Sequence, residues 1–323
     1  MELSILRPSV PLLVGAVLLD LLLGDPVYTA HPVRLMGWSL TQLEKLLRVL
    51  KLDGYAGGIL LFVLLATAWC GGLSLLVLAL GRWNRWASFC FQLLLVYSLI
   101  ALRDLLRHGR AVEVAVRQGS LPDAHCEISK LVGRDTEHMD FAACRRAAIE
   151  SLSENLTDGF VSPIFWYAVG GLPGIVLFKV VSTMDSMVGY KTALYLRFGW
   201  CGARLDDAMN WVPARINWIL VALCAAVLQG YSGAKALRIG WRQHALIPGP
   251  NSGWSEAATA GAIQRRLVGQ IWRQGKVVTD LWLGDATDPP AGDELDVHRA
   301  SVLMTVTGLF ATALAGLDII SIH

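Results

Sequence analysis

Acidic side chains recur at a spacing of four in one stretch of the chain, at Glu150, Glu154 and Asp158. On a helix, positions four apart lie on one face, and like charges at this spacing repel each other unless they have partners. Three interpretations are open: a face turned to water, a face that binds a hard divalent cation through oxygen ligands, or pairing with a nearby arginine such as Arg134. The acidic groups that follow favour the cation-binding face.

Further polar groups stand at the ends of apolar runs. Asp185 ends one run, and Asp206, Asp207 and Asn210 precede another. Carboxylates beside apolar segments are costly to desolvate unless they are paired or bind cations. The basic residues interleaved with them are Arg134, Lys179, Lys191, Arg204 and Arg215. Such a mixture suits a complex of magnesium with phosphate, in which carboxylates hold the metal and cations hold the phosphate oxygens.

The composition indicates that a membrane protein positions these groups. Of the 323 residues, 54% are hydrophobic and 17% are charged, against about 25% charged in a typical soluble domain. Several of the 12 tryptophans flank apolar runs, as in the interfacial belt of a bilayer. The net charge of +2 argues against nucleic acid as a partner. We therefore expect an all-α integral membrane protein with about four to five transmembrane or re-entrant helices, whose cytoplasmic helical regions form one site.

The apolar runs predict a single membrane-embedded domain over residues 1–323. The expected spans are about 10–23, 55–80, 87–102, 160–182, 212–230 and 301–320, and the cytoplasmic helical regions are about 103–159 and 231–300. The run 160–182 contains the sequence GGLPG at 170–174, which predicts a broken or re-entrant helix. Broken helices at membrane depth persist only where protein or a cavity covers the freed backbone groups.

Basic residues predict the orientation, because cytoplasmic loops carry an excess of Lys and Arg. Residues 24–53 carry four, 103–159 carry eight and 231–300 carry eight, whereas the turn 81–86 carries two. The three larger loops are therefore expected to face the cytoplasm. This predicts a multi-pass protein of the cell (inner) membrane with a cytoplasmic site. The sequence leaves open whether 160–182 and 212–230 cross fully.

Several motifs together carry a resemblance to a known family. They are GDP…HPVR at 24–34, GRDT at 133–136, AIESLSENLTDGFVSPIFW at 148–166, GGLPG at 170–174, TMDSMVGY at 183–190, RFGWCGARLDDAMNWVPAR at 197–215 and GPNSGW at 249–254. With them the chain resembles the adenosylcobinamide-phosphate synthase family (CobD/CbiB), membrane proteins of cobalamin biosynthesis. The resemblance runs from about residue 10 to the last span. The loop 284–296 does not match in detail.

The resemblance implies an amide-forming ligase that joins aminopropanol or its O-phosphate to adenosylcobyric acid, giving adenosylcobinamide or its phosphate. Because an amide forms uphill from a free carboxylate in water, ATP and Mg²⁺ are expected to take part. The chain has no GxxxxGK[ST] motif, so nucleotide binding would be unconventional. The implied partners are the corrinoid, the aminoalcohol, the lipid bilayer and other cobalamin-assembly membrane enzymes. A membrane transporter or a corrinoid-binding scaffold are the alternatives, since transporters also use broken helices.

Under this resemblance the chemistry falls on three groups of residues. The expected catalytic residues are Glu154, Asp185, Lys191 and Asp206, with Asp185 as the base that deprotonates the amine. The expected magnesium ligands are Glu150, Glu154, Asp158, Asp206 and Asp207. The residues expected to bind substrate or phosphate are His31, Arg34, Arg134, Asp135, Thr136, Asn155, Lys179, Ser186, Tyr190, Arg204, Asn210, Arg215, Asn251 and Trp254. Asp135 or Thr136 could instead cap the acidic helix, and a lone histidine such as His31 is usually structural.

Overall fold

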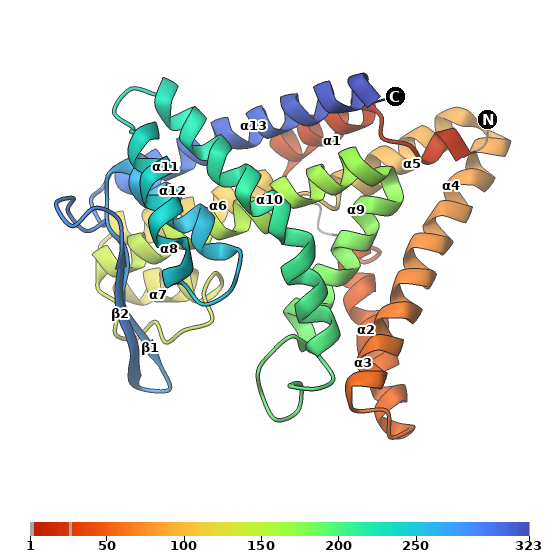
Figure 1. Ribbon diagram of the computed structural model, residues 1–323, viewed down its shortest axis with the longest axis horizontal. Coiled ribbons are helices and arrows are strands. Elements are labelled where there is room, and N and C mark those ends of the chain that lie inside the picture. The colour runs from red at the N-terminus through yellow and green to blue at the C-terminus, as the bar shows by residue number, and fades with distance from the viewer. Residues whose placement is uncertain (1–2, 26–27, 323) are drawn as a thin grey trace. The chain divides into compact units, whose positions relative to one another are not determined.

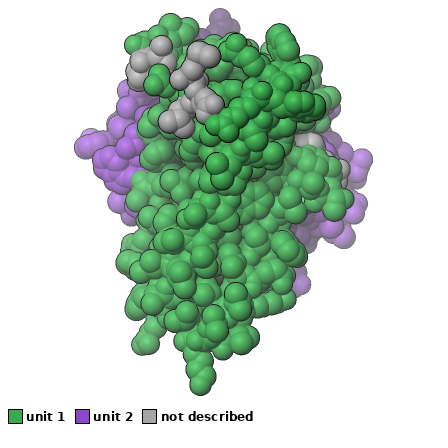
Figure 2. Space-filling model, turned by 90° about the vertical axis from the view of Figure 1, so that its right-hand side faces the viewer, with its two compact units in different colours: residues 1–101, 162–210, 312–323 green, residues 102–161, 211–311 purple. Residues whose placement is uncertain are grey.

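The computed structural model describes residues 3–25 and 28–322 and is mostly helical (Figure 1). Pro26, in the GDP motif, lies outside the described residues. Contacts divide the chain into two compact units (Figure 2). Unit 1 contains residues 1–101, 162–210 and 312–323, and unit 2 contains 102–161 and 211–311. The predicted single membrane domain is thus built from two interleaved units.

Unit 1 is a set of apolar helices. Its elements are η1 (Leu3–Leu6), α1 (Val10–Leu23), α2 (Pro32–Val49), α3 (Tyr55–Ala66), the π-helical turn η2 (Thr67–Gly71), α4 (Gly72–Trp83), α5 (Arg85–Tyr97), α9 (Ser162–Val188) and the first part of α10 (Trp200–Val227). α1 and α4 both pack on α5, and α2 packs on α3 and α9. Asn84 forms the tight corner between α4 and α5, because its side chain accepts hydrogen bonds from the backbone N–H groups of Trp86 and Ala87.

The break predicted at GGLPG lies at Gly171 inside α9. Its φ of 59° is left-handed, and a Cβ at this position would lie 2.1 Å from the carbonyl oxygen of Leu6. Only glycine adopts such a backbone without strain, and here it also admits a close backbone approach. The sequence therefore breaks the helix where the chain of η1 passes.

Unit 2 holds the more polar helices. Its elements are α6 (Leu102–Arg117), α7 (Leu121–Ser129), α8 (Phe141–Leu156), the π-helical turn η3 (Thr157–Val161), the part of α10 from Trp211 onward, α11 (Gly233–Gln243), η4 (His244–Leu246), α12 (Ser252–Ile263), β1 (Leu267–Arg273), β2 (Lys276–Leu283) and most of α13 (Asp296–Ile322). α6, α7 and α8 enclose a core that includes Val112, Ile128 and Cys144. Asp140 begins α8 by accepting a hydrogen bond from the N–H of Ala143 at 2.7 Å.

The prediction that 231–300 is helical is wrong for residues 267–283, which form an antiparallel hairpin. The strands are rich in β-branched and aromatic residues, which favour extended backbone. The turn residues Gln274 and Gly275 both have positive φ, at 52° and 71°, as the tight hairpin turns require. The structure of residues 284–295 is irregular, so α13 begins only at Asp296.

Six helices of the described chain are long and apolar enough to cross a membrane, by length and composition. They cover Ser4–Leu23, Tyr55–Trp83, Arg85–Arg117, Phe141–Val188, Trp200–Val227 and Asp296–Ser321. The all-α, multi-pass membrane class is therefore confirmed, and the predicted count of four to five helices is low. All six helices extend beyond their predicted spans. The largest extensions occur where polar residues at 103–117, 141–159 and 200–211 continue the helices of the apolar runs.

Candidate functional site

A cavity of about 620 Å³ in unit 2 gathers acidic and basic side chains within apolar walls. It lies between α8, α12, the β1–β2 hairpin and the loop before α8, which Figure 1 shows as neighbouring elements. Its charged lining residues are Arg134, Glu150, Glu154, Glu256 and Arg273, and its apolar ones include Leu131, Leu246, Ile271 and Leu281. Three of the predicted site residues, Arg134, Glu150 and Glu154, therefore meet here.

Arg134 and Glu150 form a buried ion pair in this cavity. Arg134 Nη2 donates to Glu150 Oε2 at 2.8 Å, and the two side chains are 8% and 10% exposed. Glu150 Oε1 also accepts the backbone N–H of Val268 on β1 at 3.0 Å. Of the interpretations left open by the sequence, pairing with an arginine is the one observed for Glu150. Arg134 Nε is buried and has no hydrogen-bond partner among the described residues, so it remains available to an anion.

Glu256, near the start of α12, is the most deeply buried unpaired carboxylate of the cavity. It is 7% exposed, and its carboxylate forms no hydrogen bond or ion pair within residues 3–25 and 28–322. Burial raises the pKa of Glu256 well above its usual range, the charges of Glu154 and Glu150 add to the effect, and Arg134 opposes it. Glu154 lines the same cavity and is exposed.

The other predicted residues of unit 2 make mainly structural contacts. Asp135 binds the hairpin turn: its carboxylate accepts the N–H of Gly275 at 2.8 Å, and its own N–H donates to Trp272 O at 2.9 Å. The Thr136 carbonyl accepts the N–H of Met139, and the Asn155 side chain bonds back to Ser151 one turn earlier. Asp158 is the second residue of the π-helical turn and is not among the lining residues of the cavity.

Arg215 and Trp254 belong to an aromatic cluster in unit 2. The Arg215 guanidinium lies over Trp211 at 4.0 Å and over Trp254 at 4.9 Å from the ring centroids. Trp254 stacks on His244 at 3.7 Å and is 4% exposed. Asn251 precedes α12 at the capping position without a side-chain cap bond. These residues anchor the start of α12, the helix that carries Glu256.

A second polar group lies in unit 1, around Asp206. Ser162 Oγ donates to Asn210 Oδ1 at 2.6 Å, and Asn210 Nδ2 donates to Asp206 Oδ2 at 3.1 Å. Asp206 and Asn210 therefore share a helix face, as their spacing predicts. Asp185 and Asp207 are close enough to repel Asp206 electrostatically, and Lys179 opposes them. The predicted acidic group of unit 1 is thus brought together.

The remaining predicted residues of unit 1 are more dispersed. His31 is buried and pairs with Asp25 at 3.1 Å, which fits a structural role at the start of α2. Arg204 forms an exposed pair with Asp207 at 3.5 Å. The exposed predicted residues beside these are Arg34, Ser186, Tyr190 and Lys191.

The five predicted magnesium ligands are divided between the two units. Glu150, Glu154 and Asp158 belong to unit 2, whereas Asp206 and Asp207 belong to unit 1. Within the described ranges, no group of three or more His, Cys, Asp or Glu side chains is arranged to hold a metal ion. Glu150 is already neutralised by Arg134. The carboxylates fit Mg²⁺ only as a partial set that substrate oxygens would complete.

Sequence reasoning missed Glu256, Arg273 and Ser162. Glu256 directly follows the GPNSGW motif and stands alone in the apolar run of α12, and such an isolated carboxylate is the signal that could have identified it. Arg273 lies on the hairpin that was expected to be helical. Ser162 carries no sequence signal, because its partner Asn210 is 48 positions away.

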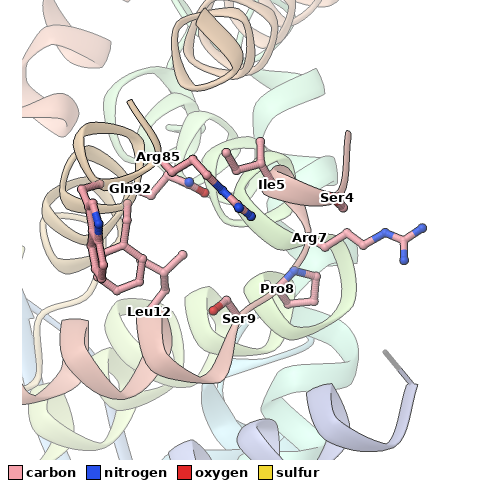
Figure 3. Close-up of a pocket in the computed structure, with 10 residues that line it drawn as sticks. Ser4, Ile5, Arg7, Pro8, Ser9, Leu12, Arg85 and Gln92 are labelled. Carbon is pink, nitrogen blue, oxygen red and sulfur yellow. The ribbon is translucent and has the colours of Figure 1, made fainter. Parts of the chain in front are cut away.

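A cavity of about 430 Å³ in unit 1 has a different character (Figure 3). It lies between η1, the start of α1 and the start of α5. Arg85 extends toward its centre, and the side chain of Arg7 points away from it. It contains none of the predicted site residues.

Comparison with known proteins identifies the family. The model of the CobD/Cbib protein family matches residues 13–304. The chain is 39% identical over 305 residues to the cobalamin biosynthesis protein CobD of Yersinia enterocolitica, covering 94% of this chain and 95% of that protein. It is 36% identical over 301 residues to the cobalamin biosynthesis protein CbiB of Salmonella choleraesuis, covering 92% and 93%. It is 37% identical over 310 residues to the CobD protein of Pelobacter propionicus, covering 96% and 94%. No solved structure matches the chain. The chain therefore belongs to the CobD/CbiB family.

Proposed function

We propose that this chain is a membrane enzyme of cobalamin biosynthesis that performs an ATP-dependent amide ligation. It joins aminopropanol or its O-phosphate to a propionate carboxylate of adenosylcobyric acid and releases adenosylcobinamide or its phosphate. The names of the relatives support the pathway, and the six candidate spans support a membrane location. The active site lies on the cytoplasmic side of the cell (inner) membrane.

The observation that carries the reaction type is the cavity of unit 2, where Arg134 and two unpaired carboxylates share one space. An amide forms from a free carboxylate only after activation. Phosphoryl transfer from ATP to the propionate gives an acyl phosphate and ADP, and attack by the amine then displaces phosphate. Phosphoryl transfer depends mainly on positioning and on cations that neutralise the phosphate oxygens. The unpartnered Nε of Arg134 supplies such a cationic donor.

Magnesium enters this proposal with the nucleotide. In nucleotide sites Mg²⁺ is commonly held by one or two carboxylates and by substrate phosphates. The ion would neutralise charge on the phosphate oxygens.

A turnover assay on the protein in nanodiscs tests the proposal. The mixture contains adenosylcobyric acid, aminopropanol phosphate, ATP and Mg²⁺, each omitted in turn, and mass spectrometry follows the corrinoid. The expected result is a corrinoid that gains the aminoalcohol only when ATP and Mg²⁺ are present. Product without ATP would remove the acyl-phosphate step. Failure with every aminoalcohol, from folded protein, would refute the ligase.

A further inference from the structure

The carboxylate of Glu256 faces a cavity with no partner, which is an unusual arrangement for a buried acid. Buried charged groups are nearly always paired, because an unpaired one loses its hydration without compensation. Glu256 is 7% exposed and lines the cavity of unit 2, and none of its oxygens accepts a hydrogen bond within the described chain. A ligand that donates hydrogen bonds would satisfy it.

The charge around Glu256 indicates the sign of that ligand. Glu154 and Glu150 repel the Glu256 carboxylate, and Arg134 is the one basic group that acts on it. Arg134 is committed to Glu150 at 2.8 Å. Arg273, the other basic residue of the lining, is exposed on β1. After the Arg134–Glu150 pair is set aside, Glu154 and Glu256 remain as two acids without a cation, and the space beside them favours a positive charge.

The number of ligands favours an ammonium group over a metal ion. No three metal-ligating side chains converge anywhere in residues 3–25 and 28–322, so a metal ion here would take most of its ligands from substrate or water oxygens. A primary ammonium has a single charge and three N–H donors, so two carboxylates can satisfy most of it. The cavity of about 620 Å³ leaves room for the rest of a small amine.

We infer that Glu154 and Glu256 hold the ammonium group of the amine substrate, and that Glu256 is the base that removes its proton. The inference rests on the proposed ligation, and it locates the binding site of the amine substrate in the cavity of unit 2. In the step, R–NH₃⁺ gives one proton to the Glu256 carboxylate, which becomes a carboxylic acid, and the electron pair of R–NH₂ then attacks the acyl carbon of the acyl phosphate. The C–N bond forms as the acyl C–O bond breaks, and phosphate leaves with the second N–H proton. Asp185, the base expected from the sequence, belongs to unit 1 and does not line this cavity.

The direction of the Glu256 pKa agrees with this role. A general base transfers protons best when its pKa approaches that of the donor, and burial with two neighbouring acids raises the pKa of Glu256 toward that of an amine. Before the amine binds, the raised pKa makes the Glu256 carboxyl easier to protonate than an ordinary glutamate. An arriving ammonium favours the charged carboxylate, so amine binding should release a proton that Glu256 later takes back from the substrate.

Calorimetry in nanodiscs tests the inference without turnover. The probes are 1-amino-2-propanol and its neutral analogue propane-1,2-diol, each titrated in two buffers of different ionisation enthalpy, which reports proton release. We expect the wild type to bind the amine with proton release and not to bind the diol. Glu256→Gln should weaken amine binding by about tenfold or more and abolish the release, a loss of about 1.4 kcal/mol or more. Glu127→Gln, a control at a half-exposed acid paired with Lys130, should change neither.

Kinetics separate this inference from the ligation. In the turnover assay Glu256→Gln should lower kcat by about 10²-fold or more, the usual worth of a general base, while Glu154→Gln should raise mainly the KM for the amine. Glu256→Asp keeps the charge and should retain part of the proton release, and it serves as the second variant if Glu256→Gln does not fold.

Four results would decide the matter. If wild type and Glu256→Gln bind the amine equally, or turn over with equal kcat, the inference fails while the ligase stands. Equal binding of the diol also overturns it. Displacement of the amine by Mg²⁺ in the wild type but not in Glu256→Gln would replace it with a metal site. Glu256-dependent amine binding without any ligation would keep the ammonium site and remove the proposed function.

Discussion

The ion pair between Arg134 and Glu150 should be one of the most costly interactions to remove in unit 2. The two side chains are 2.8 Å apart and at most 10% exposed. Replacing one partner of a buried pair leaves the other charge without compensation, which costs about 3–5 kcal/mol. In Glu150→Gln the new side chain can still accept the N–H of Val268. The loss should therefore fall near the lower limit, at about 3 kcal/mol.

This loss is large enough to measure by thermal unfolding. For a unit of this size, about 1 kcal/mol shifts the midpoint by about 2–4 °C, so Glu150→Gln should melt roughly 6–12 °C below the wild type. Intrinsic fluorescence of the 12 tryptophans in detergent provides the signal. The control is Glu127→Gln, whose pair with Lys130 is more exposed. A pair of this kind contributes about 0–1 kcal/mol.

The double variant Arg134→Met/Glu150→Gln separates the pair from its surroundings. Because it leaves neither charge behind, it should recover part of the stability that Arg134→Met or Glu150→Gln loses alone. The reasoning would be refuted if Glu150→Gln melted within about 2 °C of Glu127→Gln. Strict additivity in the double variant would also refute it, because a coupled pair cannot be additive.

Three further changes test other parts of the structure. Gly171→Ala should cost more than about 2 kcal/mol, because its Cβ would meet a backbone oxygen at 2.1 Å in a left-handed conformation; Gly170→Ala, with nothing within 4 Å, should melt almost as the wild type does. Ser162→Ala should cost about 1–2 kcal/mol, because buried Asn210 loses a 2.6 Å hydrogen bond, and Ser162→Thr would count against this if it melted no higher than Ser162→Ala. The raised pKa of Glu256 stabilises the fold below the unfolded pKa of about 4.3, and this stabilisation is lost as the pH rises through the folded pKa. Glu256→Gln should thus melt above the wild type at pH 8. The difference in unfolding free energy between the two proteins should shrink toward pH 5, by about 1.4 kcal/mol for each pH unit between the two pKa values of Glu256. A difference that did not change with pH would contradict the burial of an unpaired acid.

Features set by local spacing could be predicted from the sequence. The break at Gly171 and the shared face of Asp206 and Asn210 both follow from residue types within a few positions of each other. Periodicity and backbone preference act over one or two turns of helix, and they decide these features before any tertiary contact forms.

Features that depend on distant contacts could not be predicted. Glu150 and Glu154 share one helix face, as expected, and both line the cavity. The π-helical turn at Thr157–Val161 changes the helical repeat, so Asp158 does not lie on that face and does not line the cavity. Glu150 pairs with Arg134 and not with another arginine because the loop before α8 brings Arg134 next to it. Glu256 joins the site from more than 100 positions away, because α12 packs on α8.

The β1–β2 hairpin has a consequence for the local dynamics of unit 2. A ribbon of two strands is marginally stable alone, and its order here comes from anchors outside it. The Val268 amide is held by Glu150 at 3.0 Å, and the Gly275 amide by Asp135 at 2.8 Å. These two amides should exchange with deuterium only when their carboxylate anchors release them, whereas the outward amides near exposed Val277 should exchange quickly. Because the same hairpin forms one wall of the cavity, the rate at which Val268 exchanges should measure how often that wall opens.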